Sequence, residues 1–148
     1  MTEYKYLIVA FATLFLAQII KFTIESIQER RLKWGRLFNG SGGMPSSHSS
    51  FSFSLTMMIG INEGFSSPLF AIALIFSFVV AYDAMGLRME SGRQAEAINR
   101  IAEEIINHNY KIGIKHLKEE LGHNPIEVLM GMVLGITTSI IFTMLFAI

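Results

Sequence analysis

The stretch that decides the fold is Pro68-Leu-Phe-Ala-Ile-Ala-Leu-Ile-Phe-Ser-Phe-Val-Val-Ala-Tyr-Asp-Ala-Met-Gly-Leu87. It is long enough to cross a bilayer, since a transmembrane helix needs about 20 mostly apolar residues to span about 30 Å of hydrocarbon. Two other segments also qualify: Tyr6 to Phe22, whose helix is expected to continue to Ile27, and Ile126 to Ile148. The sequence therefore predicts an all-α integral membrane protein.

A fourth segment, Ser49 to Ile61, is shorter and rich in serine, so either a crossing helix or a re-entrant one is compatible with it. We predict that it crosses, because a helix that starts near Ser46 reaches about 24 Å at about 1.5 Å per residue. Serines buried against neighbouring helices would cover the shortfall.

A cleaved signal peptide is the alternative for the first segment, but its A-x-A-like triplet, residues 10–12, lies inside the apolar run. We thus expect a bundle of about four transmembrane helices.

The composition excludes several classes of protein. The chain has 148 residues, 51% of them hydrophobic and 16% charged, with a mean hydropathy of +0.45. Twelve Lys and Arg balance twelve Asp and Glu, which argues against a nucleic-acid partner and an acidic disordered tail. The absence of cysteine excludes disulfides and thiolate metal sites. At this length we expect one membrane-embedded domain over residues 1–148.

Two polar stretches separate the apolar segments, Gln28 to Ser47 and Arg88 to Asn124. In the second, Ile98, Ile101 and Ile105 recur at helical spacing. This spacing predicts an amphipathic helix on the membrane surface or over the polar ends of the spans. Ten of the twelve Lys and Arg fall in these two stretches. With four spans both stretches share one side, and the positive-inside rule makes that side cytoplasmic.

The most informative motif is Gly40-Ser-Gly-Gly-Met-Pro-Ser-Ser-His-Ser-Ser50. Glycines let backbone N–H groups converge, Pro45 fixes the entry to the next helix, and Ser46 or Ser47 would cap that helix. A helix start is a ready anion site, where His48 is placed to donate a proton to a leaving oxygen. The alternative is a flexible loop before a capped helix, but such a cap needs one serine rather than this whole run.

A second motif, Gly122-His-Asn-Pro-Ile-Glu127, opens the last apolar segment. His123 and Glu127 are four residues apart and so lie on one helical face. A carboxylate that accepts from one imidazole nitrogen leaves the other unprotonated and aimed at phosphorus, as in nucleophilic triads. The alternative is a capping box of Asn124, Pro125 and Glu127, which leaves His123 unexplained.

Further charged residues lie near the ends of the apolar segments. Arg88 is a candidate for bidentate phosphate binding, with Asp83 orienting it or His48, although Asp83 and Arg88 alternatively form an intramembrane pair. Arg93 is a second candidate phosphate ligand. Lys21 reaches the same face of the membrane, unless it merely snorkels to the interface.

Three sequence blocks resemble the divergent bacterial and plant branch of the type 2 phosphatidic acid phosphatase and vanadium haloperoxidase superfamily. They are Gly-Gly-Met-Pro-Ser-Ser-His-Ser (42–49), Tyr-Asp-Ala-Met-Gly-Leu-Arg (82–88) and Leu-Gly-His-Asn-Pro-Ile-Glu-Val (121–128). By this resemblance His48 is the acid of a Pro-Ser-Gly-His block, with Ser47 in place of the glycine. His123 matches the nucleophilic histidine, and Glu127 stands where the superfamily has aspartate.

Two departures from the superfamily pattern concern the phosphate ligands. Leu117 stands six residues before His123, where the pattern has arginine, so Arg88 is the candidate replacement. Six residues beyond Lys21 or Lys33 there is no Arg-Pro pair. The superfamily core has more helices than this chain supplies, and a homodimer would compensate.

The resemblance implies a lipid phosphatase in a bacterial plasma membrane, with phosphatidylglycerophosphate, phosphatidate or polyprenyl diphosphate as open substrate types. His123 would attack phosphorus, Glu127 would orient it and His48 would protonate the leaving alkoxide. Lys21, Arg88 and the backbone amides of residues 42–47, which include those of Gly43, Ser46 and Ser47, would hold the phosphoryl oxygens.

We expect no cofactor and no metal, since the histidines form no H-E-x-x-H pattern. His108 and His116 have no partner at ligand spacing and are expected at the surface. The rival interpretation is a non-catalytic membrane protein for lipid binding or assembly that keeps the anion pocket.

Overall fold

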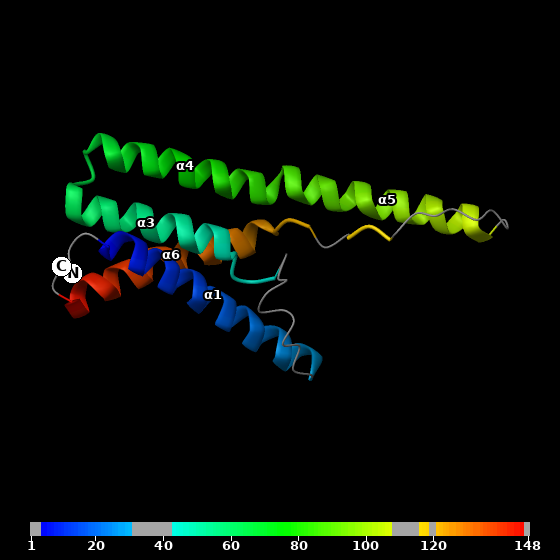
Figure 1. Cartoon of the computed structure of the whole chain (residues 1–148), viewed down its shortest axis with the longest axis horizontal. Coiled ribbons are helices and arrows are strands. Elements are labelled where there is room, and N and C mark those ends of the chain that lie inside the picture. Colours follow the sequence, from blue (N-terminus) through cyan, green and yellow to red (C-terminus); the bar gives the residue numbers. More distant parts are fainter. Residues whose placement is uncertain (1–3, 31–42, 108–115, 119–120, 147–148) are drawn as a thin grey trace.

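The computed structural model describes residues 4–30, 43–107, 116–118 and 121–146, and the secondary structure of these residues is entirely helical (Figure 1). This confirms the predicted all-α membrane fold. The helices are α1 (Lys5–Glu29), α3 (Ser47–Glu63), α4 (Pro68–Met85), α5 (Leu87–Asn107) and α6 (Pro125–Phe146). Among the described residues, three helical stretches are long and apolar enough to cross a membrane: Lys5–Gln28, Pro68–Ile106 and Pro125–Phe146.

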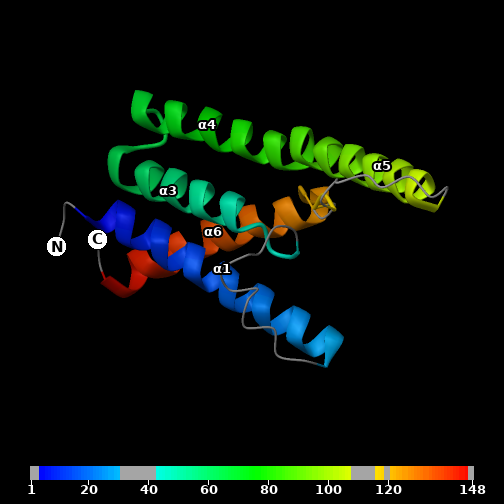
Figure 2. The same cartoon turned by 45° about the vertical axis from the view of Figure 1, so that its right-hand side comes forward.

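Helix α3 is the central helix of the bundle, although with 17 residues it is too short to count among those three. It packs against α1, α4 and α6, and it runs from the end of the bundle where α6 begins to the end where α4 begins (Figures 1 and 2). The segment therefore traverses the bundle and does not turn back on itself, and its crossing of the membrane stays a prediction. The start of α1, the end of α6 and the α3–α4 turn all lie at the opposite end from the start of α6.

The serines of α3 are buried against two glycines of α6. Ser49, Ser50 and Ser54 have no exposed surface. A Cβ atom on Gly131 would lie 2.5 Å from the Ser46 carbonyl oxygen, and one on Gly135 would lie 2.5 Å from the Ser50 carbonyl oxygen. Small residues allow such close backbone contact between membrane helices. The packing therefore provides the serine burial that was expected to make up for the short length of α3.

We predict that Gly135→Val destabilises the bundle by about 1–3 kcal/mol, because the added side chain has no space without a backbone shift. Thermal unfolding in detergent should show a lower Tm. A matched control is Ile141→Phe, which adds bulk on an outward face where the side chain is 56% exposed. An unchanged Tm for Gly135→Val would contradict the packing described for α3 and α6.

The amphipathic helix predicted around Ile98 to Ile105 is present as part of α5. It continues in nearly the direction of α4 and extends beyond the bundle, instead of folding back over the helix ends (Figures 1 and 2). The reason is that the hydrogen-bond ladder is kept at the junction, where Gly86 N–H donates to the Tyr82 carbonyl at 2.8 Å and Glu90 N–H donates to the Gly86 carbonyl at 3.0 Å.

Candidate active site

The His123 side chain is held by Glu127 from the first turn of α6. His123 Nδ1 and Glu127 Oε2 are 2.9 Å apart, and the His123 side chain is only 6% exposed. The same oxygen accepts from the Asn124 backbone N–H at 3.2 Å. Glu127 therefore makes the carboxylate bond of the capping box and also bonds the histidine, so the two alternatives drawn from the sequence are compatible. With Nδ1–H donating to the carboxylate, Nε2 carries the free lone pair.

Backbone contacts fix the His123 segment against the α4–α5 junction. His123 N–H donates to the Ala84 carbonyl at 2.9 Å. Gly122 has a φ of +90°, and a Cβ there would lie 2.6 Å from the Met89 backbone nitrogen. A side chain at position 122 is thus excluded both by its backbone conformation and by the lack of space.

His48 is the second residue of α3, and the structure brings it to the same place as His123. Ser46 caps α3 by accepting from Ser49 N–H, and Ser46 N–H donates to the Glu127 carbonyl at 2.9 Å. This bond joins the start of α3 to the start of α6. His48 itself is solvent-exposed, and His123 is close enough to act on it electrostatically. The two predicted catalytic histidines therefore lie near each other, at the starts of α3 and α6.

The hydrogen bond from Ser46 corrects one expectation. Its amide was predicted to hold a phosphoryl oxygen, but that N–H is already donated to a carbonyl and the residue has no exposed surface. Ser46 is a capping residue that links two helices. Ser47 is also buried, at the first position of α3. Gly43 is partly buried in the preceding loop with a φ of +82°, and Gly42 lies outside the described residues.

Arg88 and Asp83 form an ion pair where α4 passes into α5. Arg88 Nε and Asp83 Oδ2 are 2.7 Å apart, and the Arg88 side chain is 49% exposed. Both charges act on His48. The pair therefore lies near His48, and it is compatible with both interpretations drawn from the sequence, an arginine oriented for phosphate and a simple ion pair. Arg93 lies on α5, where it pairs with Glu90 at 2.7 Å and is 65% exposed.

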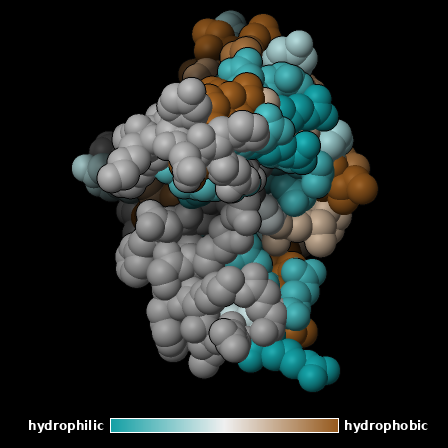
Figure 3. Space-filling model, turned by 90° about the vertical axis from the view of Figure 1, so that its right-hand side faces the viewer, coloured by the Kyte–Doolittle hydropathy of each residue, from teal (hydrophilic) through white to brown (hydrophobic). Residues whose placement is uncertain are grey.

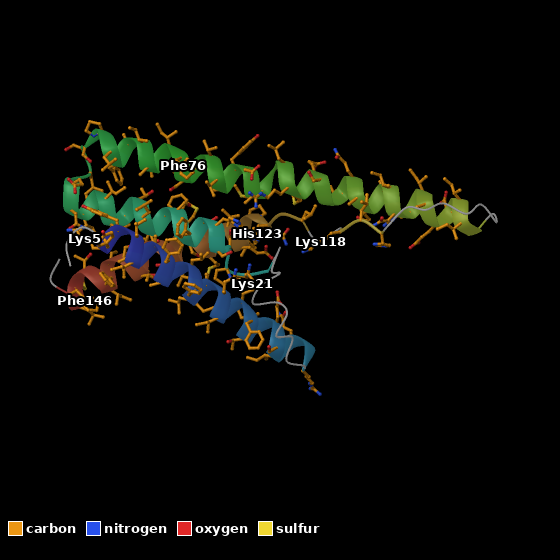
Figure 4. The ribbon with its side chains drawn as sticks, in the orientation of Figure 1. Lys5, Lys21, Phe76, Lys118, His123 and Phe146 are labelled. Atoms are coloured by element: carbon orange, nitrogen blue, oxygen red, sulfur yellow. The ribbon has the colours of Figure 1, made fainter. Side chains whose placement is uncertain are left out.

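Lys21 is buried, not snorkelling. Its side chain is 2% exposed, and its positive charge is close enough to both histidines to influence them electrostatically. The packing brings it against Gly43, since a Cβ on that glycine would lie 3.4 Å from Lys21 Cγ. Figure 4 shows Lys21 and His123 at the same end of the bundle, with Lys5 and Phe146 at the other. Viewed from the direction in which α5 extends, the described residues include many hydrophilic side chains (Figure 3).

Sequence reasoning gave no role to two residues that share a helical face with Lys21. The same Cβ on Gly43 would lie 2.7 Å from Glu25 Oε1, so this carboxylate faces the loop. Gln18 Oε1 is buried and has no hydrogen-bond partner among the described residues. Gln18, Lys21 and Glu25 share one helical face by their spacing. Polar residues at that spacing in an apolar helix were the available signal.

Of the two remaining histidines, the structure describes only His116. His116 is exposed, as predicted, and its Nδ1 lies 3.2 Å from Asn99 Nδ2. His108 lies outside the described residues. Within the described ranges, no group of three His, Cys, Asp or Glu side chains is placed to hold a metal ion.

Burial lowers the pKa of His123 below its ordinary value of 6.5. The hydrogen bond to Glu127 and its charge oppose this shift, while Lys21 and Arg88 add to it. His123 is therefore neutral, and able to act as a nucleophile, at neutral pH.

This balance predicts opposite pH shifts for two variants. Glu127→Gln removes an influence that raises the His123 pKa, so for the phosphate release that the resemblance implies the acid limb of kcat/KM should move to lower pH, with a plateau lower by about 10²–10⁴-fold. Lys21→Met removes a charge that lowers the pKa, so its acid limb should move to higher pH. Measuring every variant on one substrate cancels the titration of the substrate.

The control for these two variants is Glu90→Gln on α5, which should leave the limb in place. A shift of the Glu127→Gln limb to higher pH would refute the role given to this carboxylate.

Comparison with known proteins gives two matches. A family model described as "Divergent PAP2 family" matches residues 2–138. The "Uncharacterized membrane protein YuiD" of Bacillus subtilis (strain 168) is 36% identical over 150 residues, which cover 95% of this chain and 94% of that protein. No solved structure matches the chain significantly.

Proposed function

The chain belongs to the divergent PAP2 family of membrane proteins, as the resemblance predicted, and from this premise we propose that it is a lipid phosphatase. Its substrate is a lipid phosphate or diphosphate, of the phosphatidylglycerophosphate, phosphatidate or polyprenyl diphosphate type. One observation carries the proposal: a buried histidine, bonded to a carboxylate at 2.9 Å, shares a site with a second histidine and two cations. Phosphoryl transfer to a histidine can use such a set, with the carboxylate orienting the nucleophile and the cations stabilising the charge on the phosphoryl oxygens.

The proposed reaction has two steps. In the first, Nε2 of His123 attacks phosphorus, the bond from phosphorus to the lipid oxygen breaks, and His48 donates a proton to the departing alkoxide. In the second, the now neutral His48 accepts a proton from water while the water oxygen attacks the phosphohistidine. The phosphorus–nitrogen bond then breaks, which releases inorganic phosphate and restores both histidines.

Charge on the phosphoryl oxygens is stabilised by fixed groups. Lys21 and Arg88 act on both histidines, so their charges lie close to the position that the phosphate would occupy. The N-terminal end of α3, with the positive end of its helix dipole, begins at Ser47 beside His48. These groups are held in place before the reaction, which is the condition for effective electrostatic stabilisation. We assign no role to a metal.

The competing function is binding of a lipid phosphate without turnover. Leu117 occupies the position where the superfamily pattern has arginine, and its backbone is bonded on both sides to the Asn99 side chain. One cation of the pattern is thus replaced by a side chain that cannot bind phosphate.

Release of inorganic phosphate separates the two functions. Purified protein in detergent with a chelator would be supplied with phosphatidate, phosphatidylglycerophosphate and polyprenyl diphosphate. We expect turnover of at least one of them, lost in the His123→Ala variant. Binding of these lipids without any turnover would instead support the non-catalytic function.

We further propose that the protein lies in a bacterial plasma membrane with its site on the cytoplasmic side, and this topology is testable because the chain has no cysteine. Single cysteines at Ser66, in the α3–α4 turn, and at Lys118, near the site end, are both exposed positions. In intact cells an impermeant maleimide should label position 66 and not 118. Inverted vesicles should give the reverse pattern. Labelling of both positions from the same side would contradict the arrangement.

A further inference from the structure

We propose that an apolar groove between α1 and α6 holds one hydrocarbon chain of the phosphate-bearing lipid. The inference rests on the proposed function, because it assumes a lipid phosphate at the two histidines. The α1–α6 groove has a volume of about 200 Å³. Its walls are Ile20 and Ile24 of α1, Met44 and Pro45 of the loop, and one face of α6. Pockets for whole small molecules are larger, about 300–1,000 Å³, so this size suits part of a chain.

Helix α6 presents two different faces to its neighbours. Val128, Gly131, Gly135 and Ser139 are buried on one of them. The groove is lined by the other face, which carries Met130, Val133, Leu134 and Thr137. Apart from the threonine this face is apolar.

The hydroxyl group of Thr137 is satisfied within its own helix, since it donates to the Val133 carbonyl oxygen at 2.8 Å. The groove wall therefore offers apolar contact and no unmet hydrogen-bond donor from this side chain.

The residues that line the groove adjoin those of the candidate active site along three segments of the chain. Met44 and Pro45 stand directly before Ser46, the cap of the helix that carries His48. On α6, Glu127, Met130 and Leu134 follow each other at helical spacing, so the stripe that starts at the carboxylate bonded to His123 runs on into the groove. On α1, the two groove residues flank the buried Lys21 in sequence.

The depth of the groove fits a chain attached to a phosphate at the site. Met130 and Thr137 follow Pro125 by five and twelve residues, which places them about 8 and 18 Å along the helix at about 1.5 Å per residue. The hydrocarbon region is about 30 Å thick. A lipid with its phosphate at the start of α6 would thus extend its chain along the groove toward the bilayer centre, with the cations above neutralising its headgroup.

Photocross-linking tests this assignment without requiring turnover. The intact protein, in phosphatidylcholine nanodiscs, would be given phosphatidate with a diazirine in one acyl chain, and the labelled residues would be mapped by mass spectrometry. We expect labelling within residues 20–24 and 130–137 that excess unlabelled phosphatidate suppresses. Labelling near Ile72 and Ile75, both 66% exposed on α4, serves as the background from bulk lipid. Equal labelling of α4 and α6, or labelling that phosphatidate does not compete, would overturn the proposal.

A groove-filling variant gives an independent readout. Val133→Trp places bulk in the groove at a position 47% exposed, where the side chain can be accommodated without disturbing the α3 interface. We expect it to remove the competed labelling and to lower kcat/KM for long-chain phosphatidate by about tenfold or more. Turnover of a short-chain phosphatidate should be unchanged. The matched control is Ile75→Trp.

The two proposals fail separately in these experiments. Turnover by the parent protein without competed labelling of the groove would overturn the chain site and leave the phosphatase intact. Competed labelling of the groove without turnover of any lipid would overturn the phosphatase and leave the chain site intact.

Discussion

Replacing His123 by alanine is expected to abolish phosphate release, with a loss of at least about 10³-fold, because a covalent nucleophile is removed. The fold should survive. The His123 segment is tied to α4 through its backbone N–H, a bond to the Ala84 carbonyl that alanine keeps. Glu127 also keeps its hydrogen bond to the Asn124 N–H. Phosphate release, Tm and circular dichroism in the same detergent would check the two halves of this prediction.

The covalent intermediate offers a direct test of the same residue. Rapid acid-free quenching of the parent protein with a phosphate-labelled lipid should trap label on His123, and the His123→Ala protein should trap none. His116→Ala is the control, since that side chain is exposed and its Nδ1 contacts the Asn99 side chain on α5. Retention of more than about a tenth of the parental rate by His123→Ala would refute the nucleophile assignment.

Replacing His48 by alanine should produce a loss that depends on the leaving group. For an alkyl phosphate, we expect a decrease of about 10²–10⁴-fold, the usual contribution of a general acid. For a nitrophenyl phosphate the decrease should be below about tenfold, because this leaving group departs without protonation. Comparing kcat on the two substrates, for the parent and the variant, gives the ratio directly.

Equal losses on the two substrates would exclude His48 as the acid. A structural role for His48 would also predict a lower Tm. We expect no decrease in Tm, because the side chain is exposed and α3 is capped by Ser46 rather than by the histidine. The Tm of His48→Ala therefore distinguishes a chemical role from a packing role.

The site combines helix capping with the proposed chemistry. Glu127 accepts from the Asn124 N–H at the start of α6 and holds His123, while Ser46 caps α3 and donates its N–H to the Glu127 carbonyl. The groups that cap the starts of these two helices are therefore also the groups that position the two histidines relative to each other. A rigid support of this kind is what a preorganised site requires.

Features that depend on residues close together in the sequence were predictable from the sequence. The length and hydropathy of the apolar runs in α1, α4 and α6 are enough to predict membrane-spanning helices. The pair of His123 and Glu127 was also foreseen, since residues four apart on a helix are neighbours wherever the helix lies. The capping serine before α3 follows the same local logic.

Only the tertiary structure decided how these pieces meet. The burial of Lys21, the approach of Glu25 to Gly43 and the use of the Ser46 amide all join residues distant in the chain. The central position of α3 depends on the absence of side chains at Gly131 and Gly135, which lets two helix backbones touch. Hydropathy and spacing fix which residues share a helical face, whereas close packing between faces fixes which faces meet. For this reason the sequence by itself supplied the two histidines, and only the packing of α3 on α6 brought them near each other at one end of the bundle.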